Sequence, residues 1–323
     1  MRAVVVERHG GPEVLHVAER EAPRPGPGQL RVEVAAAGVN FMDIYQRQGG
    51  GAYQVDVPFV PGAEGAGTVA AVGAEVAEVA VGDRVAWTGV PGGYAEEVVI
   101  PADRAVPVPE DVDLPVAAAA MLQGMTAHYL SHDTYPVASG DAVVVHAAAG
   151  GVGLLLTQMV RMRGGTPIGT TSTEDKAALA REAGADHVAG YDGFRDAVLE
   201  ITGGEGAAAV YDGVGRATFD DSLRSLRRRG TMVLYGAASG PVPPFDLQRL
   251  AAGGSLFITR PTLGDYILRR DELLRRADDL FTWIRQGRLQ VRIGGTYPLD
   301  EAPRAHEDLA GRRTTGKLLL LPR

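Results

Sequence analysis

Two patterns of hydrophobic and polar positions follow one another along the chain. From residue 1 to about residue 120, short β-type runs are interrupted by glycine and proline, which predicts a mainly β, barrel-like unit. The predicted strands of this unit are residues 3–7, 29–36, 67–72, 84–88, 94–100 and 105–107.

A second pattern begins near residue 123 and ends near residue 262. Short apolar runs alternate with segments of helix length, which is typical of βαβ units in a parallel, doubly wound sheet. We interpret the basic run Arg227-Arg228-Arg229 as the solvated end of a helix. The predicted strands are residues 142–146, 166–170, 208–212 and 231–235, and the predicted helices are residues 153–163 and 174–183.

The last segment returns to the first kind of pattern. A long amphipathic helix at 271–286 precedes strands at 297–299 and 317–321, and these strands need a partner. Rejoining the first unit is the simplest solution. We therefore predict an α/β fold in which a Rossmann sheet, residues 123–262, is inserted into a mainly β domain formed by residues 1–122 and 263–323.

Composition narrows the function classes. The 323 residues are 45% hydrophobic and 22% charged, which fits a folded globular protein of about two domains. The net charge of −8 disfavours nucleic acid and anionic membranes as partners. The chain has no cysteine, which excludes disulfides, a thiolate nucleophile, Cys-ligated zinc and iron–sulfur clusters. No apolar run approaches the roughly 18 residues of a membrane span, and we expect a soluble, cytoplasmic protein.

A glycine-rich segment follows the first predicted strand of the Rossmann sheet. It reads His-Ala-Ala-Ala-Gly-Gly-Val-Gly at residues 146–153 and opens a predicted helix. Against the dinucleotide fingerprint Gly-x-Gly-x-x-Gly, Ala148 stands at the first glycine, Gly150 at the second and Gly153 at the third. Gly150 would let the backbone approach a pyrophosphate, and Gly153 would let the helix lie close to the strand. The helix N-terminus would offer free N–H groups to the anion.

The end of the second strand distinguishes NADP from NAD. An acidic residue about 20 residues after the loop binds a free ribose 2′-hydroxyl in NAD-dependent proteins. Here Thr-Thr-Ser-Thr occupies residues 170–173, and Lys176 follows. Hydroxyl groups and an ammonium would bind a 2′-phosphate by charge-assisted hydrogen bonds, so we expect NADPH. Glu174 and Asp175 lie in the same segment, and Lys176 could also be an ordinary exposed helix lysine.

Four motifs together resemble those of the zinc-independent quinone oxidoreductases, the zeta-crystallin-like branch of the medium-chain dehydrogenase/reductase superfamily. They are the glycine loop, Gly-Val-Asn-Phe-Met-Asp at 38–43, Pro-Gly-Ala-Glu-Gly-Ala-Gly at 61–67 and Gly-Asp-Arg-Val at 82–85. The resemblance extends over nearly the whole chain. It implies a GroES-like catalytic domain split around a Rossmann domain, with NADPH in the cleft between them.

The resemblance also implies a site without metal. Zinc-dependent members of the superfamily bind metal through a Cys and a His at the positions of Asn40 and Ala63, and only the neighbouring Glu64 is retained here. Without zinc, reduction of a simple ketone loses a Lewis acid. A quinone does not need one, because its hydride adduct is a phenolate whose conjugate acid titrates near the tyrosine value of about 10. We therefore expect direct hydride transfer from NADPH to a quinone.

The cofactor contacts of the family can be carried over to matching positions. They comprise the segment beside the nicotinamide, the pyrophosphate turn, the 2′-phosphate and ribose contacts, and two strand ends. These positions are Asn40, Phe41, Tyr45, Tyr129, Gly151, Val152, Ser172, Lys176, Tyr191, Tyr235, Gly236, Ala237, Ala238, Ile258, Thr259, Arg260 and Arg312.

Five residues are candidates for a catalytic role. Tyr45 and Tyr53 could donate a hydrogen bond to a substrate carbonyl, or could be structural. Asn40 could instead cap a helix or form a turn, and Asp43 could orient the loop. Gln123 departs from the family pattern, in which relatives often carry Lys in the Leu-x-Gly-Met-Thr motif.

Two alternatives remain beside the quinone reductase. One keeps fold and cofactor but reduces the alkene of an activated enone or enoyl thioester. The other is a cofactor-binding, crystallin-like or RNA-binding protein with little turnover. Related proteins dimerise at the edge of the Rossmann sheet, so the resemblance also implies a homodimer through the apolar run between Ser255 and Thr259.

Overall fold

The computed structural model describes residues 1–50 and 53–322. The chain divides into two compact units, one formed by Met1–Met125 with the segment from Ile267 onward, the other by Thr126–Tyr266. These boundaries fall a few residues after the predicted ones, the first of them within helix α2 (Leu114–Tyr129).

The first unit is built around a sheet that, in the described residues, has seven strands. Along its path the strand order is β14-β15-β3-β4-β5-β7, and β6 also pairs with β3. The long strand β3 (Gln29–Val39) lies between β4 (Glu64–Val72) and β15 (Lys317–Leu321), antiparallel to both. Because β15 pairs with the end of β3, Lys317 is brought next to residues 38–40 although it lies far away in sequence.

The other elements of the first unit complete its core, which buries Trp87 and Tyr94 entirely. The strands are β1 (Arg2–Val6), β2 (Leu15–Glu19), β5 (Arg84–Thr88), β6 (Glu97–Pro101), β7 (Val106–Pro107) and β14 (Ile293–Pro298). The helices are η1 (Pro12–Val14), α1 (Phe41–Gln48), η3 (Ala102–Arg104), α9 (Arg270–Arg285), η5 (Leu299–Glu301) and α10 (Ala302–Ala310).

The second unit contains a parallel sheet, six-stranded in the described residues, with the order β10-β9-β8-β11-β12-β13. This is the doubly wound arrangement expected from the alternating pattern, and the predicted α/β class is confirmed. Its strands are β8 (Ala142–Val145), β9 (Thr166–Thr170), β10 (His187–Ala189), β11 (Ala207–Asp212), β12 (Leu226–Leu234) and β13 (Phe257–Thr259).

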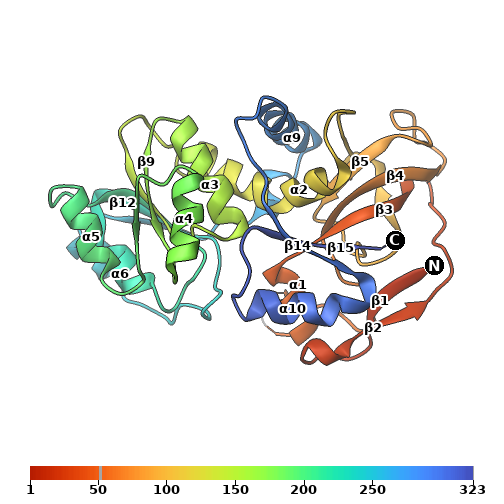
Figure 1. The fold of residues 1–323 in the computed structure, drawn as a ribbon, viewed down its shortest axis with the longest axis horizontal. Coiled ribbons are helices and arrows are strands. Elements are labelled where there is room, and N and C mark those ends of the chain that lie inside the picture. Colours follow the sequence, from red (N-terminus) through yellow and green to blue (C-terminus); the bar gives the residue numbers. More distant parts are fainter. Residues whose placement is uncertain (51–52, 323) are drawn as a thin grey trace. The chain divides into compact units, whose positions relative to one another are not determined.

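Helices flank this parallel sheet, as Figure 1 shows for α3, α4, α5 and α6. Helices α3 and α4 contact strands β8, β9 and β10, whereas α6 contacts β11 and β12. The central strands β8 and β11 are mostly apolar and buried, because both faces of the sheet are covered there. The helices are α3 (Gly151–Met162), α4 (Glu174–Glu182), α5 (Phe194–Ile201), α6 (Phe219–Arg224), α7 (Gln248–Ala252) and α8 (Leu263–Tyr266), with a π-helical turn η4 (Leu130–Thr134) after α2.

The interpretation of Arg227-Arg228-Arg229 as a helix end is wrong, because these residues belong to β12. Leu226 pairs with Ala207, but the next pair in the register joins Thr231 to Ala209, so the arginines lie in an irregular stretch where the ladder is interrupted. Their side chains are exposed at the beginning of the strand. The run of three arginines therefore marks the irregular beginning of β12, not the end of a helix.

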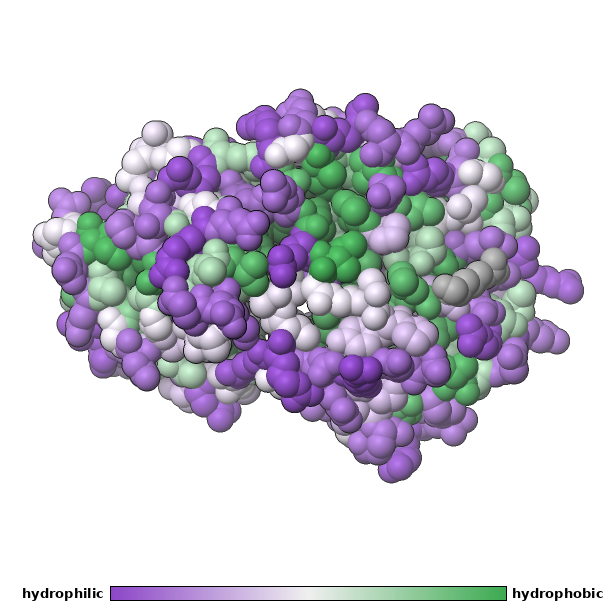
Figure 2. Space-filling model, viewed as in Figure 1, coloured by the Kyte–Doolittle hydropathy of each residue, from purple (hydrophilic) through white to green (hydrophobic). Residues whose placement is uncertain are grey.

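Hydrophilic residues cover most of the face drawn in Figure 2, with apolar residues between them. Among the described residues, no helix combines the length and the apolar character that crossing a membrane requires.

Candidate functional site

The glycine loop joins β8 to the N-terminus of α3. Gly150 is the N-cap of α3 and has no side chain to cap it, and the first N–H groups of a helix have no acceptor within the helix. A Cβ atom at Gly153 would lie 2.2 Å from the carbonyl oxygen of Ala147, so only glycine permits this close approach. The residue in the left-handed conformation is Ala147, with φ of 51°, one position before the predicted first glycine. The turn thus offers backbone N–H groups to an anion, as the fingerprint predicts.

A buried hydrogen-bond chain lies where strands β8, β9 and β11 end, next to this loop. His146 Nδ1 is 2.8 Å from Thr170 Oγ1, and His146 Nε2 is 2.8 Å from Ser222 Oγ. Ser222 also lies 3.1 Å from Asp212 Oδ2, to which it donates. Ser222 therefore accepts the Nε2 proton, and His146 Nδ1 accepts from Thr170. Burial lowers the pKa of His146 against the opposing charge of Asp212, which favours this neutral ring.

Asp212 ends this chain with both oxygens occupied. Its Oδ1 accepts the backbone N–H groups of Val214 and Gly215 at 2.7 and 2.9 Å, and its Oδ2 accepts Thr218 Oγ1 at 2.7 Å as well as Ser222. Asp212 is fully buried. It holds the turn after β11 in place. The sequence analysis did not predict this network. The available signal was Asp212 itself, a carboxylate at the end of an otherwise apolar strand.

The predicted 2′-phosphate segment lies at the end of β9 and the start of α4. Thr173 is the N-cap of α4 and accepts from the Lys176 backbone N–H, while Ser172 is exposed and Lys176 half-buried. Glu174, which could accept a ribose hydroxyl, forms an ion pair with Arg181 at 2.5 Å. One acidic group of this segment is thereby engaged along the helix surface, and hydroxyl groups stand at the strand end.

The other predicted residues of the second unit are distributed around its strand ends. Tyr235 follows β12, and its ring crosses so close to Gly213 that a Cβ there would lie 2.9 Å from it. Tyr191 follows β10 and is half-buried, with its ring 6.3 Å from that of His146. Tyr129 is 2% exposed and stacks on Tyr266 at 4.2 Å between ring centroids. Of the remaining positions, Gly236, Ala237 and Ala238 follow β12, Ile258 and Thr259 lie in β13, and Arg260 comes directly after it.

In the first unit, two aromatic rings of helix α1 and the ring of Tyr53 form a row. Phe41 and Tyr45 have ring centroids 6.2 Å apart, and Tyr45 and Tyr53 have ring centroids 5.4 Å apart. All three are half-buried, so each keeps an accessible part. The helix begins with a capping box in which Asn40 caps the helix N-terminus and Asp43 accepts the Asn40 backbone N–H at 2.8 Å. Phe41, Tyr45 and Tyr53 together form a surface suited to a flat ring.

Asn40 points inward rather than toward solvent. Its Nδ2 donates to Glu64 Oε1 at 2.7 Å, and its Oδ1 accepts from Lys317 Nζ at 2.7 Å. Lys317 also forms a short ion pair with Glu64, and the Glu64 Oε2 atom accepts the backbone N–H of Leu122 at 2.6 Å. Lys317 was not predicted as a site residue, because its partners lie more than 250 residues away in sequence.

Asp43 belongs to a second buried group. Its Oδ2 accepts Tyr94 Oη at 3.1 Å, Tyr94 Oη lies 3.1 Å from His306 Nε2, and His306 Nδ1 lies 3.3 Å from Arg47 Nη1. A guanidinium only donates, so Nδ1 accepts and Nε2 carries the proton that it shares with Tyr94. Burial, and then the Arg47 charge, lower the pKa of His306 to about 3, so the ring is neutral. The hydrogen bonds all run in one direction, toward Asp43.

The carboxyl group of Asp43 is only partly satisfied. Its Oδ1 is buried and has no hydrogen-bond partner within residues 1–50 and 53–322. Burial raises the pKa of Asp43 to about 7, against the lowering effects of the Asn40 N–H group, Lys317 and Tyr94. Asp43 can therefore change its protonation state near neutral pH.

Gln123 and Arg312 complete the predicted positions. Gln123 is half-buried in α2, and its Oε1 atom is enclosed without a partner in the described part of the chain. Its neighbour Leu122 is bound to Glu64, which connects the Gln123 segment to Asn40. Arg312 is exposed in the turn after α10, where its φ of 55° is left-handed.

Neither the histidines nor the carboxylates gather into a metal centre in the described residues, since no group of three or more His, Cys, Asp or Glu side chains could hold an ion. His128 and His132 stack ring on ring, with centroids 4.4 Å apart.

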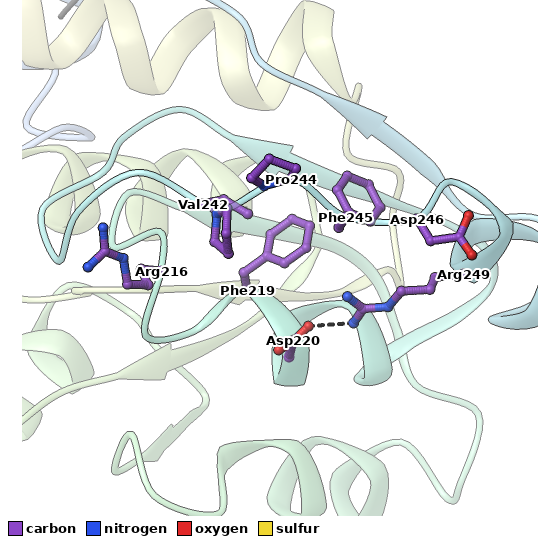
Figure 3. Close-up of a pocket in the computed structure, with 9 residues that line it drawn as sticks. Arg216, Phe219, Asp220, Val242, Pro244, Phe245, Asp246 and Arg249 are labelled. Atoms are coloured by element: carbon purple, nitrogen blue, oxygen red, sulfur yellow. Dashed lines mark hydrogen bonds and ion pairs between the residues drawn. The ribbon is translucent and has the colours of Figure 1, made fainter.

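A surface pocket of about 440 Å³ lies on the second unit, and none of the predicted residues lines it. Figure 3 shows Phe219 and Phe245 on its wall, and their rings meet edge to face at 5.1 Å. Arg249 lies at one end, where it is paired with Asp220. Part of the pocket is lined by the loop between β12 and α7. No sequence motif predicted it.

Comparison with known proteins covers the whole chain. Residues 26–110 match the model of the alcohol dehydrogenase GroES-like domain, and residues 151–274 match that of the zinc-binding dehydrogenases. A quinone oxidoreductase of Pseudomonas aeruginosa is 44% identical over 97% of both chains, and a 2-haloacrylate reductase of a Burkholderia species is 43% identical over 99% of this chain and 98% of its own. The crystal structure of Escherichia coli quinone oxidoreductase complexed with NADPH superposes with a TM-score of 0.96 at 40% identity, covering all of both chains.

Proposed function

The chain belongs to the zinc-independent quinone oxidoreductases of the medium-chain dehydrogenase/reductase superfamily, and from this premise we propose that it reduces quinones with NADPH. The observation that carries the choice of NADPH is the end of β9. There, hydroxyl groups and Lys176 stand where an NAD-dependent protein places an acidic residue, and Glu174 is engaged by Arg181.

The glycine loop supports binding of the pyrophosphate. Because Gly150 has no side chain to cap the N-terminus of α3, a pyrophosphate can reach the N–H groups of Gly151 and Val152. Gly153 lets the helix lie close to the loop that precedes it. We propose that Ser172 and Lys176 hold the 2′-phosphate and that Tyr191 contacts the ribose. NADPH supplies the hydride when it is bound. The second unit is thus the proposed cofactor-binding domain, and the first the proposed catalytic domain.

The row of aromatic rings formed by α1 and Tyr53 supports a flat acceptor. Phe41, Tyr45 and Tyr53 offer ring faces and edges, and the two tyrosines can donate a hydrogen bond to a quinone oxygen. Negative charge that develops on this oxygen is delocalised over the ring, so hydroxyl donors and solvent suffice to stabilise it. Asn40, which is buried and bonded at both ends of its amide, is assigned to shaping this surface.

Reduction of an activated alkene is the second candidate, because a 2-haloacrylate reductase is 43% identical to this chain. In that reaction the hydride goes to the β-carbon of an alkene conjugated with a carboxylate. The same fold and cofactor would serve, and the acceptor surface would differ.

Initial rates of NADPH oxidation distinguish the two. The panel comprises benzoquinones, naphthoquinones, enones, 2-chloroacrylate and an enoyl thioester, each repeated with NADH. We expect the highest kcat/KM with quinones and a clear preference for NADPH. Turnover of 2-chloroacrylate without turnover of any quinone would establish the alternative instead, and oxidation of neither coenzyme by any acceptor would refute both.

We also propose that the protein is a cytoplasmic homodimer. Strand β13 is an edge of the parallel sheet. Phe257 in this strand is 60% exposed, and Leu247 in the preceding segment is 66% exposed. An exposed apolar edge strand favours pairing with a second copy. Sedimentation velocity tests this proposal: Phe257→Lys should convert a dimer to a monomer, and a wild-type monomer at micromolar concentration would refute it.

A further inference from the structure

Four segments of the first unit meet at the carboxylate of Glu64. Oε1 accepts the Lys317 ammonium from β15 and the Asn40 amide from the start of α1, while Oε2 accepts the Leu122 N–H from α2. Lys317 returns to Asn40 through a bond from Nζ to Oδ1 of 2.7 Å. The side chains of Glu64 and Lys317 are 0% and 1% exposed. Three side chains and one backbone group are thus closed into a single buried group.

The backbone around this group is shaped to admit it. A Cβ atom at Gly38 would lie 2.2 Å from Glu64 Oε1 and 2.6 Å from Lys317 Cε, although Gly38 has an ordinary backbone conformation. Glycine is required here for space. A buried carboxylate without a partner is strongly unfavourable, so Glu64 depends on the ammonium, and the ammonium depends on Glu64. Gly38, Glu64 and Lys317 therefore form one buried cluster, which we call the Glu64 cluster.

The Glu64 cluster fixes the positions of the two segments that carry the proposed acceptor site. Asn40 is the first residue before α1, so fixing both ends of its amide fixes the start of the helix that bears Phe41 and Tyr45. Leu122 precedes Gln123, so the bond to Glu64 fixes the second segment at the same point.

Partly satisfied polar groups belong to the residues around the same point. Asp43 Oδ1, Gln123 Oε1 and Thr88 Oγ1 are buried without a partner in the described residues, and Thr88 is the direct cross-strand neighbour of Glu64. Buried polar atoms of this kind need a water molecule or a ligand group. Asp43 and Gln123 thus carry such atoms on two of the segments that Glu64 joins, and Thr88 carries one on the neighbouring strand β5.

We propose that Lys317 is a positioning residue for hydride transfer, acting through Glu64 and Asn40 to hold the start of α1 and the Gln123 segment at a fixed separation. The proposal rests on the proposed function. Lys317 itself is too buried to contact an acceptor, and it lies outside the predicted cofactor contacts. Its loss should therefore slow the chemical step and leave NADPH binding unchanged.

The test compares two variants with the wild type. Lys317→Met removes the ammonium and strands the carboxylate, which lowers stability as well as activity. Lys317→Met/Glu64→Gln removes both charges, and the Gln amide can still accept the Leu122 N–H or the Asn40 amide. The double variant thus removes both buried charges together with the Lys317 ammonium that binds Asn40 Oδ1. As a matched control, Arg285→Met breaks an exposed ion pair with Asp111 in the same unit.

Three quantities are measured: the Tm, the Kd for NADPH by fluorescence titration, and the single-turnover rate of NADPH oxidation by a benzoquinone. We expect the double variant to have the Tm of the control and the Kd of the wild type. Its single-turnover rate should stay about 100-fold below that of the wild type, because a small misplacement of the reacting groups lowers the rate by about this factor.

Recovery of the rate together with the Tm would show that the pair only neutralises charge, and would overturn the proposal. A Kd that rises in parallel with the loss of rate, or a double variant that does not fold, would overturn it as well. Failure of the wild type to oxidise NADPH with any quinone is a separate outcome, which refutes the proposed function.

Discussion

Two fully buried aspartates, one in each unit, are treated differently by their surroundings. Asp212 meets four donors, two for each oxygen, at the end of a parallel strand. Asp43 receives two donors, both on Oδ2, and its Oδ1 has none in the described residues. Burial raises the pKa of Asp43 to about 7. The comparison teaches that burial alone does not fix the role of a carboxylate. Four donors let Asp212 hold its turn in place, whereas Asp43 keeps one oxygen without a donor in the described residues.

The largest expected effect is on the fully satisfied carboxylate. Asp212→Ala leaves two backbone N–H groups and two hydroxyl groups without an acceptor in the core of the second unit. We expect a loss of about 5 kcal/mol in the free energy of unfolding, or failure to fold. Urea denaturation measures it, with Asp221→Ala, an exposed aspartate on α6, as the control. A loss equal to that of the control would mean that the four bonds do not contribute.

Asp43 should show the opposite behaviour, in which its charge lowers stability. Its pKa is about 7 in the folded chain and near 3.8 when exposed, so the folded state binds more protons between these values. Stability contributed by Asp43 is therefore present at low pH and is lost as pH rises from about 4 to about 7, by about 4 kcal/mol in total. Asp43→Asn should remove this dependence. Urea denaturation of both proteins from pH 4 to 7.5 tests it, and parallel curves would contradict the assignment.

The prediction for the second unit concerns Lys176, which we propose binds the 2′-phosphate of the cofactor. Lys176→Ala should remove a charged hydrogen bond to the 2′-phosphate, worth about 1.5–3 kcal/mol, or roughly 10- to 150-fold in preference for NADPH over NADH. The ratio of kcat/KM for the two coenzymes measures it. An unchanged ratio would remove Lys176 from the phosphate site, while stability should remain that of the wild type.

Tyr94→Phe tests the chain that leads to Asp43. It removes the donor to Asp43 Oδ2 and the acceptor of the His306 Nε2 proton, at a cost of about 1–2 kcal/mol. The pKa of Asp43 should rise further, because the Tyr94 hydrogen bond lowers it. The pH dependence of urea denaturation would then extend to higher pH. Tyr297→Phe, which removes a half-buried bond to Asp308, is the control and should leave that dependence unchanged.

The smallest expected effect is that of metal removal. Asn40 stands where zinc-dependent relatives place a Cys, and its amide is bound by Lys317 and Glu64 instead. Dialysis against a chelator should leave the rate of quinone reduction unchanged. Loss of the rate and its recovery with zinc would require a metal-dependent mechanism.

Local patterns predicted several strands and the glycine-rich turn between β8 and α3. Strands β5, β9 and β15 have the predicted bounds, and the fingerprint at 146–153 forms the expected loop from strand to helix. These features depend on residues close together in sequence, which periodicity and glycine spacing report. The helix at Phe41–Gln48 was not predicted, although Asn40 and Asp43 form the capping box that marks its start.

The buried polar groups could not be predicted in the same way. Lys317 reaches Glu64 and His306 reaches Arg47 across more than 250 residues. Such pairs are fixed by the pairing of β15 with β3 and by the packing of α10, which no local pattern encodes. For the same reason Asp212 was assigned only to a strand, and its four donors became visible in the folded chain.

The central claim is that this chain transfers a hydride from NADPH directly to a quinone. The most direct test is the single-turnover oxidation of NADPH by a benzoquinone, measured with NADPH that carries deuterium at the transferred C4 position. We predict that the rate falls several-fold with the deuterated coenzyme and that no semiquinone accumulates. A rate that is insensitive to the deuterium, with a semiquinone signal during turnover, would contradict direct hydride transfer.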